Sequence, residues 1–341
     1  MSENLERTTT RLNQARQSGD ADAIAEALAV HANALIQHGQ LGLAQQALEE
    51  ASNIHSSRGR TYDVARCLQM AGTLCRFQGR LDEAEKLVTR ALDFVDGAGP
   101  IAVSGYAELG EIAMASGRAA NAAAEYQAAL DAGRSTGLID SARATLLRKR
   151  AAALVSTKDY PTAVRDLQTA YELLINAGER PAATRTLIEK ATALQHARQF
   201  TEAEAVIRAA MELAQSAVDH AALADIHLLS ATQALEQHDT GAALLASQTA
   251  RSEALAGNAA TSYIGAAHAI AQLREAAGDR LGAYEALAVG WVTLGDLLPK
   301  DLARAAFEPK LREMRERWGQ DAFDETKKKY EAIRRQALGR V

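Results

Sequence analysis

The side chains in this 341-residue sequence that could bind a metal ion or act as nucleophiles include eight histidines and two cysteines. Two histidine pairs, His31/His38 and His220/His227, are seven residues apart, which places each pair on one helix face, two turns apart. Two turns rise about 10 Å, so neither pair can chelate one metal ion by itself. We therefore predict packed or surface histidines, with no metal site and no cofactor.

Motifs for nucleotide binding and metal-dependent catalysis are missing from the sequence. It has no G-x-x-x-x-G-K-[ST] phosphate loop, no H-E-x-x-H motif and no C-x-x-C pair. Cys67 and Cys75 are eight residues apart in one predicted helix, which is too far for a disulfide. They are typical of small buried side chains in a reducing compartment. We predict that the protein is not an enzyme.

Two basic clusters could bind an anion or a nucleic acid. The stretch LLRKRAAALV, residues 146–155, contains Arg148 and its two basic neighbours, and it has two interpretations: a solvated helix face or a contact for an acidic peptide. The stretch ETKKKYEAIRRQ, residues 325–336, is diluted by Glu325 and Glu331. The chain has a net charge of −5 and a pI near 6.0, so we do not expect it to bind nucleic acid.

The composition predicts that almost all of the chain is helical. Hydrophobic residues make up 48%, aromatic residues only 4%, and there are five prolines. The abundant Ala, Leu, Glu, Gln and Arg are strong helix formers. No apolar run is long enough to span a membrane, and the polar first residues lack the apolar core of a signal peptide. We expect a cytoplasmic protein.

A phrase of about 14 residues, such as GRLDEAEKLVTRAL from Gly79, recurs with a period of about 40 residues. Each copy has an alanine at one fixed place, which we name the anchor alanine: Ala44, Ala84, Ala122, Ala163, Ala203, Ala243 and Ala283. Seven residues later another small residue follows: Ala51, Ala91, Ala129, Ala170, Ala210, Ala250 and Gly290. Twelve residues before the anchor stands a third: Ala32, Gly72, Gly110, Ala151, Ala191, Ala231 and Ala271.

These small residues predict pairs of closely packed helices. A small residue on each of two helices lets their backbones approach, and larger residues such as Leu68 and Val88 fill the remaining groove. Between the helices stand turn-forming pairs such as Gly79-Arg80 and Lys158-Asp159. Each copy is therefore predicted to be two antiparallel helices of about 15–18 residues.

The pattern of small residue, turn, apolar residue and two spaced alanines resembles the tetratricopeptide repeat (TPR), in a long variant of about 40 residues. The second copy, with Gly72, Gly79, Leu81, Ala84 and Ala91, matches it well. The resemblance implies an all-α fold: a right-handed α-solenoid of about seven antiparallel helix pairs with capping helices at both ends. The expected organisation is a capping helix in 1–19, the superhelix in 20–297, and charged capping or docking helices in 298–341.

The C-terminal segment differs from the repeats because it is rich in charge. We expect two or three helices there, with Pro309 breaking the first and Gly319 preceding the last. The stretch LREMRERWGQDAFDE, residues 311–325, is similar to the end of the repeat regions in bacterial STAND-type regulators.

In the TPR family the first helix of each pair faces a concave groove. The resemblance therefore implies groove positions whose side chains are polar and could hydrogen-bond an extended peptide or a carboxylate. In this chain they are Asn33, Arg66, Gln69, Thr73, Arg76, Glu111, Arg148, Arg185, Thr192 and Gln195.

The favoured function is a non-catalytic scaffold or adaptor that binds a peptide or protein partner in this groove. The alternative is a regulatory sensor, in which a small peptide or metabolite changes the pitch of the superhelix. Gram-positive peptide-pheromone receptors resemble that arrangement. Catalysis would require a constellation assembled from separate repeats, and no such constellation is evident in the sequence.

Overall fold

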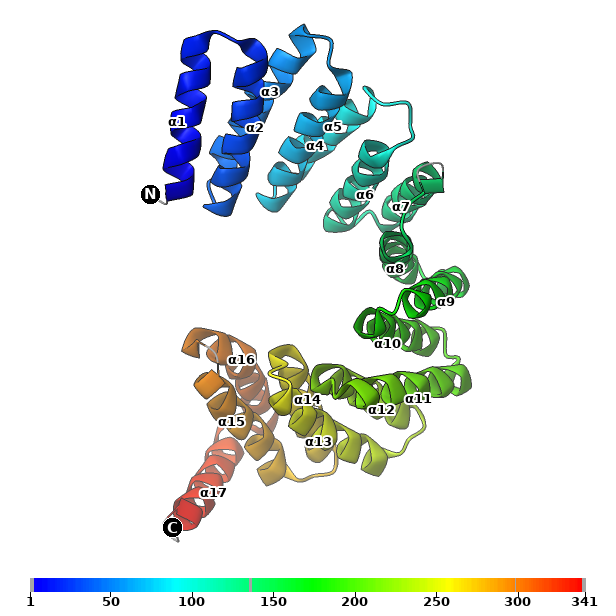
Figure 1. Cartoon of the computed structure of the whole chain (residues 1–341). Coiled ribbons are helices and arrows are strands. Elements are labelled where there is room, and N and C mark those ends of the chain that lie inside the picture. Colours follow the sequence, from blue (N-terminus) through cyan, green and yellow to red (C-terminus); the bar gives the residue numbers. More distant parts are fainter. Residues whose placement is uncertain (1–2, 135–136, 298, 339–341) are drawn as a thin grey trace. The chain divides into compact units, whose positions relative to one another are not determined.

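The computed structural model describes residues 3–134, 137–297 and 299–338, and all regular structure in these ranges is helical (Figure 1). The chain divides into two compact units, residues 1–178 and 179–341. Each unit is described by itself.

The first unit contains nine helices in the described ranges: α1 (Glu3–Ser18), α2 (Ala21–Gln37), α3 (Leu41–Ser57), α4 (Thr61–Phe77), α5 (Leu81–Leu92), α6 (Pro100–Ala115), α7 (Ala119–Arg134), α8 (Asp140–Ser156) and α9 (Tyr160–Asn176). The second contains eight: α10 (Arg180–His196), α11 (Phe200–Ala217), α12 (His220–Glu236), α13 (Thr240–Ala256), α14 (Ala260–Ala276), α15 (Arg280–Leu297), α16 (Lys300–Trp318) and α17 (Gln320–Leu338).

Helices α2 to α15 form the seven pairs that the repeat predicts, one pair per copy. All seven anchor alanines are 0% exposed, and the small residues that accompany them are buried as well. The repeat therefore marks the contact between the two helices of each pair. An all-α solenoid built from antiparallel helix pairs is confirmed.

The contact is too close for a side chain at some places. A Cβ atom added to Gly72 would lie 2.5 Å from Cγ2 of Val88 and 3.1 Å from the carbonyl oxygen of Ala84. Gly72 is on α4, whereas Val88 and Ala84 are on α5. Glycine at this position is thus a packing requirement, since the facing helix occupies the space.

The turn inside each pair places one residue in the left-handed conformation. In the second pair that residue is Gly79, with φ 76°, and Arg80 N–H closes the turn by donating to Cys75 O at 2.9 Å. In three other pairs Lys158, Arg198 and His238 adopt the same conformation, with φ between 60° and 67°. A residue with a side chain is sterically strained in the left-handed conformation, whereas glycine is not.

The C-terminal helices lie against the last repeat. On α16, Phe307 and Met314 are buried, and on α17 the ring of Phe323 packs edge-on against Tyr284 of α15 at 5.5 Å. The expectation that Pro309 breaks the helix was wrong, because α16 runs through it. Proline removes one backbone donor, but Pro309 is exposed, so water can reach the freed carbonyl, and burial of the flanking residues holds the helix.

No helix among the described residues is both long enough and apolar enough to cross a membrane.

Candidate functional site

The predicted groove positions of the second pair share one face of α4. Arg66, Gln69, Thr73 and Arg76 follow one another at spacings of three and four residues, so they form one row along the helix. Arg66 is exposed, whereas the other three are partly buried. The row therefore does not lie fully in solvent, and at Arg76 it contacts the neighbouring helix α6.

Two of the predicted residues in the first unit are engaged by neighbouring helices. Arg76 Nε donates to Oε1 of Glu108 on α6 at 2.6 Å, and both side chains are mostly buried. Glu111 accepts from the Tyr126 hydroxyl at 2.8 Å and pairs with Lys149 Nζ of α8 at 2.8 Å. These bonds join α4 to α6 and α6 to α8, so both residues brace successive pairs.

The electrostatics of Glu111 fit this bracing role. Burial by itself would raise the pKa of Glu111, but hydrogen bonds from Lys149 and Tyr126 lower it below its ordinary value. The carboxylate is therefore charged and already satisfied at neutral pH. A ligand that bound it would have to displace these partners.

The basic cluster around Arg148 is divided among several neighbours. Lys149 binds Glu111 of α6, and Arg150 forms a bidentate pair with the buried Asp166 of α9. Arg148 is partly buried and also makes an interaction within the chain. The cluster thus contributes to packing between helices, which neither of the two sequence interpretations anticipated.

Asn33 and Arg66 lie together in one pocket of the first unit, between α2 and α4, with a volume of about 540 Å³. Asn33 is exposed, and Arg66 Nη2 pairs with Oδ1 of Asp63 at 3.0 Å. Of the seven predicted residues in this unit, these two share a pocket wall.

In the second unit the three predicted residues have different surroundings. Arg185 is exposed on α10. Thr192 donates to the carbonyl of Ile188 at 2.9 Å, within its own helix. Gln195 donates to Leu229 O of α12 at 2.9 Å and so connects two first helices. The structure brings none of the three into a common pocket among those described.

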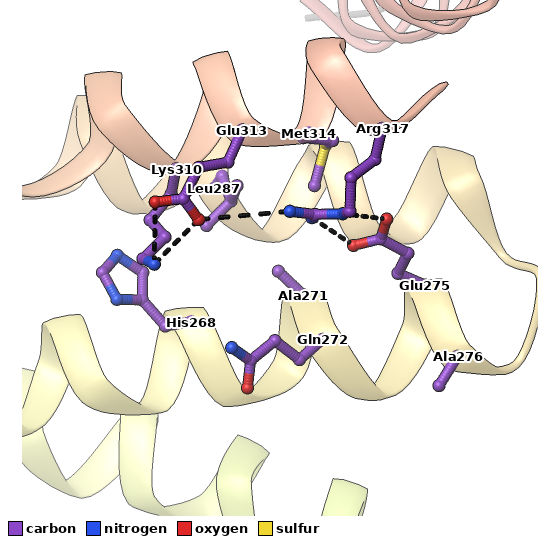
Figure 2. Close-up of a pocket in the computed structure, with 10 residues that line it drawn as sticks. All are labelled: His268, Ala271, Gln272, Glu275, Ala276, Leu287, Lys310, Glu313, Met314 and Arg317. Carbon is purple, nitrogen blue, oxygen red and sulfur yellow. Dashed lines mark hydrogen bonds and ion pairs between the residues drawn. The ribbon is translucent and has the colours of Figure 1, made fainter. Parts of the chain in front are cut away.

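A pocket of about 440 Å³ lies between α14 and α16 (Figure 2). Helix α14 contributes His268, Gln272 and Glu275, and α16 contributes Lys310 and Arg317 on the opposite wall. The apolar members of the lining are Ala271, Ala276, Leu287 and Met314. The pocket therefore combines an apolar lining with a charged rim.

The charged groups of this rim neutralise one another. Arg317 donates to Glu275 through Nε at 3.0 Å and Nη2 at 2.7 Å, and Trp318 Nε1 donates to the same carboxylate at 2.7 Å. Lys310 Nζ pairs with Glu313 at 2.9 Å. The Arg317 hydrogen bonds hold the pKa of Glu275 below its ordinary value. A ligand here gains little from the formal charges, since each already has a partner.

His268 is the unsatisfied group of this pocket. Its ring packs edge-on against Phe307 at 5.4 Å. Its Nε2 is buried and has no hydrogen-bond partner in the part of the chain that the structure describes. Burial and nearby Lys310 lower the pKa of His268, so the ring is neutral near pH 7. A neutral imidazole carries its proton on one of its two nitrogens, so with the proton on Nδ1 the Nε2 atom can accept a hydrogen bond.

The repeat could have identified these residues. His268, Gln272 and Glu275 occupy the positions in the seventh copy that Gln69, Thr73 and Arg76 occupy in the second. The predicted set contained no residue from the seventh copy. The opposite wall could not be found in this way, because α16 lies outside the repeat.

The chain offers little for catalysis in the described ranges. Residues 133–137, Gly-Arg-Ser-Thr-Gly, match the G-x-S-x-G pattern of hydrolases, in which the serine stands on a turn between a strand and a helix. Here Gly133 is part of α7, and Ser135 falls outside the described residues. Burial raises the pKa of the free thiol Cys67 to about 11, which leaves little thiolate at pH 7.

No group of three or more His, Cys, Asp or Glu residues in the described ranges could hold a metal ion. In each of the two histidine pairs, a histidine contacts another side chain: His31 contacts the Thr8 hydroxyl at 3.1 Å, and His220 contacts Glu253 at 2.7 Å.

No protein-family model and no curated protein matches the chain. Among solved structures, BtubC (BKLC) from P. vanneervenii is 17% identical with a TM-score of 0.55, covering 62% of this chain and 90% of that one. RapI in its apo form is 12% identical with a TM-score of 0.64, covering 85% and 80%. A Rap protein in complex with Competence and Sporulation Factor is 12% identical with a TM-score of 0.52, covering 99% and 100%.

At these identities the likeness shows the fold alone. Together with the buried small residues of seven helix pairs, it establishes a TPR-like helical-repeat solenoid. The resemblance of the C-terminal segment to STAND-type regulators is not confirmed by these comparisons.

Proposed function

We propose that this chain is a non-catalytic scaffold that binds a peptide or protein segment, and that the pocket between α14 and α16 receives an apolar side chain of that segment. The observation that carries the proposal is the combination of an apolar lining with the unpartnered Nε2 of His268. A backbone N–H of a bound segment could donate to this nitrogen while a side chain fills the pocket.

The remaining first-helix positions extend the proposed contact surface within each unit. Asn33 and Arg66 in the first unit, and Arg185 in the second, keep exposed polar groups that a partner can reach. Arg76, Glu111 and Gln195 contribute indirectly, since they fix neighbouring first helices to one another. The net charge of −5 disfavours nucleic acid as the partner. The two free thiols are compatible with a reducing, cytoplasmic location.

Peptides selected from a phage-displayed random library on the purified chain provide a probe for this proposal. Ala276 is exposed at the pocket wall, so Ala276→Trp fills the pocket without entering the core. We expect at least tenfold weaker binding of selected peptides by calorimetry. Ala115→Trp is the matched control, because Ala115 is exposed at the same place in the third copy. Equal affinity of both variants and the parent chain would refute the role of the pocket.

A regulatory sensor is the second candidate, because a structural neighbour that covers 99% of this chain was solved in complex with Competence and Sporulation Factor. A sensor changes conformation when its ligand binds, whereas a scaffold need not. Small-angle scattering with and without a selected peptide distinguishes them: a changed radius of gyration favours the sensor, and an unchanged radius favours the scaffold.

A further inference from the structure

The first unit contains a buried histidine at a place where the repeat otherwise has an apolar or small residue. His55 lies eleven residues after its anchor alanine. The other six copies have Val95, Gly133, Leu174, Ala214, Ala254 and Leu294 at this place. His55 is only 5% exposed, and its Nδ1 has no hydrogen-bond partner among the described residues. A buried polar atom without a partner costs about 1–3 kcal/mol, so its presence calls for an explanation.

His55 lies near the end of α3 and lines the pocket of about 540 Å³ between α2 and α4. A second atom in the same pocket is also unsatisfied: Oδ1 of Asp22 is buried without a partner in the described residues. Its other oxygen, Oδ2, has only long contacts, at 3.4 Å to Arg58 and 3.5 Å to Arg60. A carboxylate oxygen can only accept, so Oδ1 of Asp22 needs a donor that the described residues do not supply.

The other charged groups of the pocket already have partners within the chain. Asp20 caps α2 by accepting from the N–H groups of Asp22 and Ala23. Asp63 pairs with Arg66, and Glu26 pairs with Arg11 of α1. Four acids line the pocket, Asp20, Asp22, Glu26 and Asp63, against two bases, Arg60 and Arg66. Acids outnumber bases in the lining itself, and Arg11 and Arg58 from outside it pair with Glu26 and Asp22, so the two unpartnered acceptors, rather than net charge, decide which ligand fits.

We infer that this pocket binds a guanidinium group, which donates to Nδ1 of His55 and Oδ1 of Asp22. A guanidinium is planar and carries five N–H donors in a fixed fork, so it can serve two acceptors at once. An ammonium is a compact point charge with a stronger hydration shell and fits two buried acceptors less well.

The ionisation of His55 is compatible with this role. Burial lowers its pKa, and the nearby Arg60 and Arg66 act in the same direction, while Asp63 and Asp22 oppose them. The ring is therefore neutral near pH 7, and one of its nitrogens is an acceptor. The site lies in the first unit and uses no residue of the pocket between α14 and α16, and it shares only its lining residues Asn33 and Arg66 with the proposed contact surface.

The guanidinium can come from a free compound or from an arginine side chain in a peptide. Calorimetric titrations of the full chain with agmatine and with Nα-acetyl-arginine amide distinguish the two sources. Both compounds should bind saturably. If the site recognises arginine within a peptide, Nα-acetyl-arginine amide should bind at least tenfold more tightly than agmatine. Nα-acetyl-lysine amide should bind at least tenfold more weakly than the arginine compound. Tighter binding of inorganic phosphate than of either guanidinium would overturn the inference.

Two variants test the acceptors. His55→Leu introduces the residue that Leu174 and Leu294 place here in other copies, so it should fold with an unchanged or higher melting temperature. Asp22→Asn removes the charge at nearly the same size. Each should weaken guanidinium binding at least tenfold, whereas Asp82→Asn, at the matching position in the first turn of α5, should not. Unchanged affinity of folded His55→Leu would show that His55 is only a packing residue.

Discussion

At the scale of single residues, one missing Cβ atom decides how closely the third helix pair packs. A Cβ on Gly110 of α6 would lie 2.5 Å from Cε1 of Tyr126 on α7. The Tyr126 ring is 1% exposed and is held by its bond to Glu111, so it has little freedom to move away. In this pair of helices, the absence of a side chain on Gly110 makes room for the large Tyr126 ring, so the two residues together fill the space between α6 and α7.

Gly110→Ala is therefore expected to destabilise the chain by about 1–3 kcal/mol, despite the higher helix propensity of alanine. Gly42→Ala is the matched control, because Gly42 is helical and nothing lies within 4 Å of an added Cβ. That change should stabilise by about 0.5–1 kcal/mol. Urea denaturation of both variants measures the difference. If the two substitutions had the same sign, steric contact with Tyr126 would not be the cause.

The turn residues allow a second test at this scale. Lys158 has φ 67° in the place where Gly79 has φ 76°. Lys158→Gly should stabilise by about 0.5–1 kcal/mol, since relief of the left-handed strain exceeds the added flexibility of the unfolded chain. Gly79→Ala should destabilise by a similar amount, because nothing but the backbone conformation opposes its Cβ. Thermal unfolding of both variants checks the opposite signs.

At the scale of elements, helix α16 is held on α14 by a few contacts across the pocket. Phe307 and Met314 supply its buried face, and Arg317 reaches Glu275 with two hydrogen bonds. Arg317 is half exposed, but Glu275 is mostly covered and also accepts from Trp318. A bidentate, partly covered pair of this kind holds its partners more firmly than an exposed one.

We expect Arg317→Ala to destabilise the docking of α16 by about 0.5–1.5 kcal/mol, seen as faster amide exchange in that helix. Arg312→Ala is the control, since Arg312 is exposed and its ion pair among the described residues is with Glu308 of its own helix. The pKa of Glu275 is lowered in the folded chain, so the stability it contributes is present above its unfolded pKa of about 4.3 and is lost as pH falls through the folded value. The difference between parent and Arg317→Ala should therefore shrink in acid. A difference that grew in acid would exclude the ion pair as its cause.

At the scale of the whole chain, the fold could be predicted from the sequence because the same close helix contacts recur in every copy of the repeat. The anchor alanines and Gly72 indicate that the two helices of one pair pack closely. This close packing depends only on residues of the same copy, so it can be predicted without knowing how the copies are arranged. The continuous α16 was mispredicted because local propensity at Pro309 is outweighed by burial of Phe307 and Met314, which depends on α15.

Whether a predicted groove residue is exposed or bound was harder to predict, because it depends on which polar side chains of neighbouring copies contact one another. Arg76 is bound because Glu108, 32 residues later, lies opposite it. Arg66 stays exposed because its partner Asp63 is on its own helix. Periodicity gives the direction of a side chain but not its partner. Nδ1 of His55 and Nε2 of His268 have no hydrogen-bond partner among the described residues, and periodicity could not predict this either.

Four histidines distributed over both units predict how the stability of the whole chain depends on pH. Burial lowers the pKa of His31, His55, His227 and His268 below the ordinary value. The unfolded chain, with histidine pKa values of about 6.5, then binds more protons than the folded chain in the window below that value. The free energy of unfolding should thus be fully retained above about pH 7 and fall as the pH decreases from there towards 5.

The sign can be tested with His55→Leu, which cannot take up a proton. Its unfolding free energy should fall less between pH 7.5 and 5.5 than that of the parent chain, because one of the four lowered pKa values is gone. Denaturant titrations at the two pH values measure this, and the imidazole resonances followed by NMR give the individual pKa values directly. An equal or larger fall for the variant would mean that His55 does not contribute to the acid sensitivity.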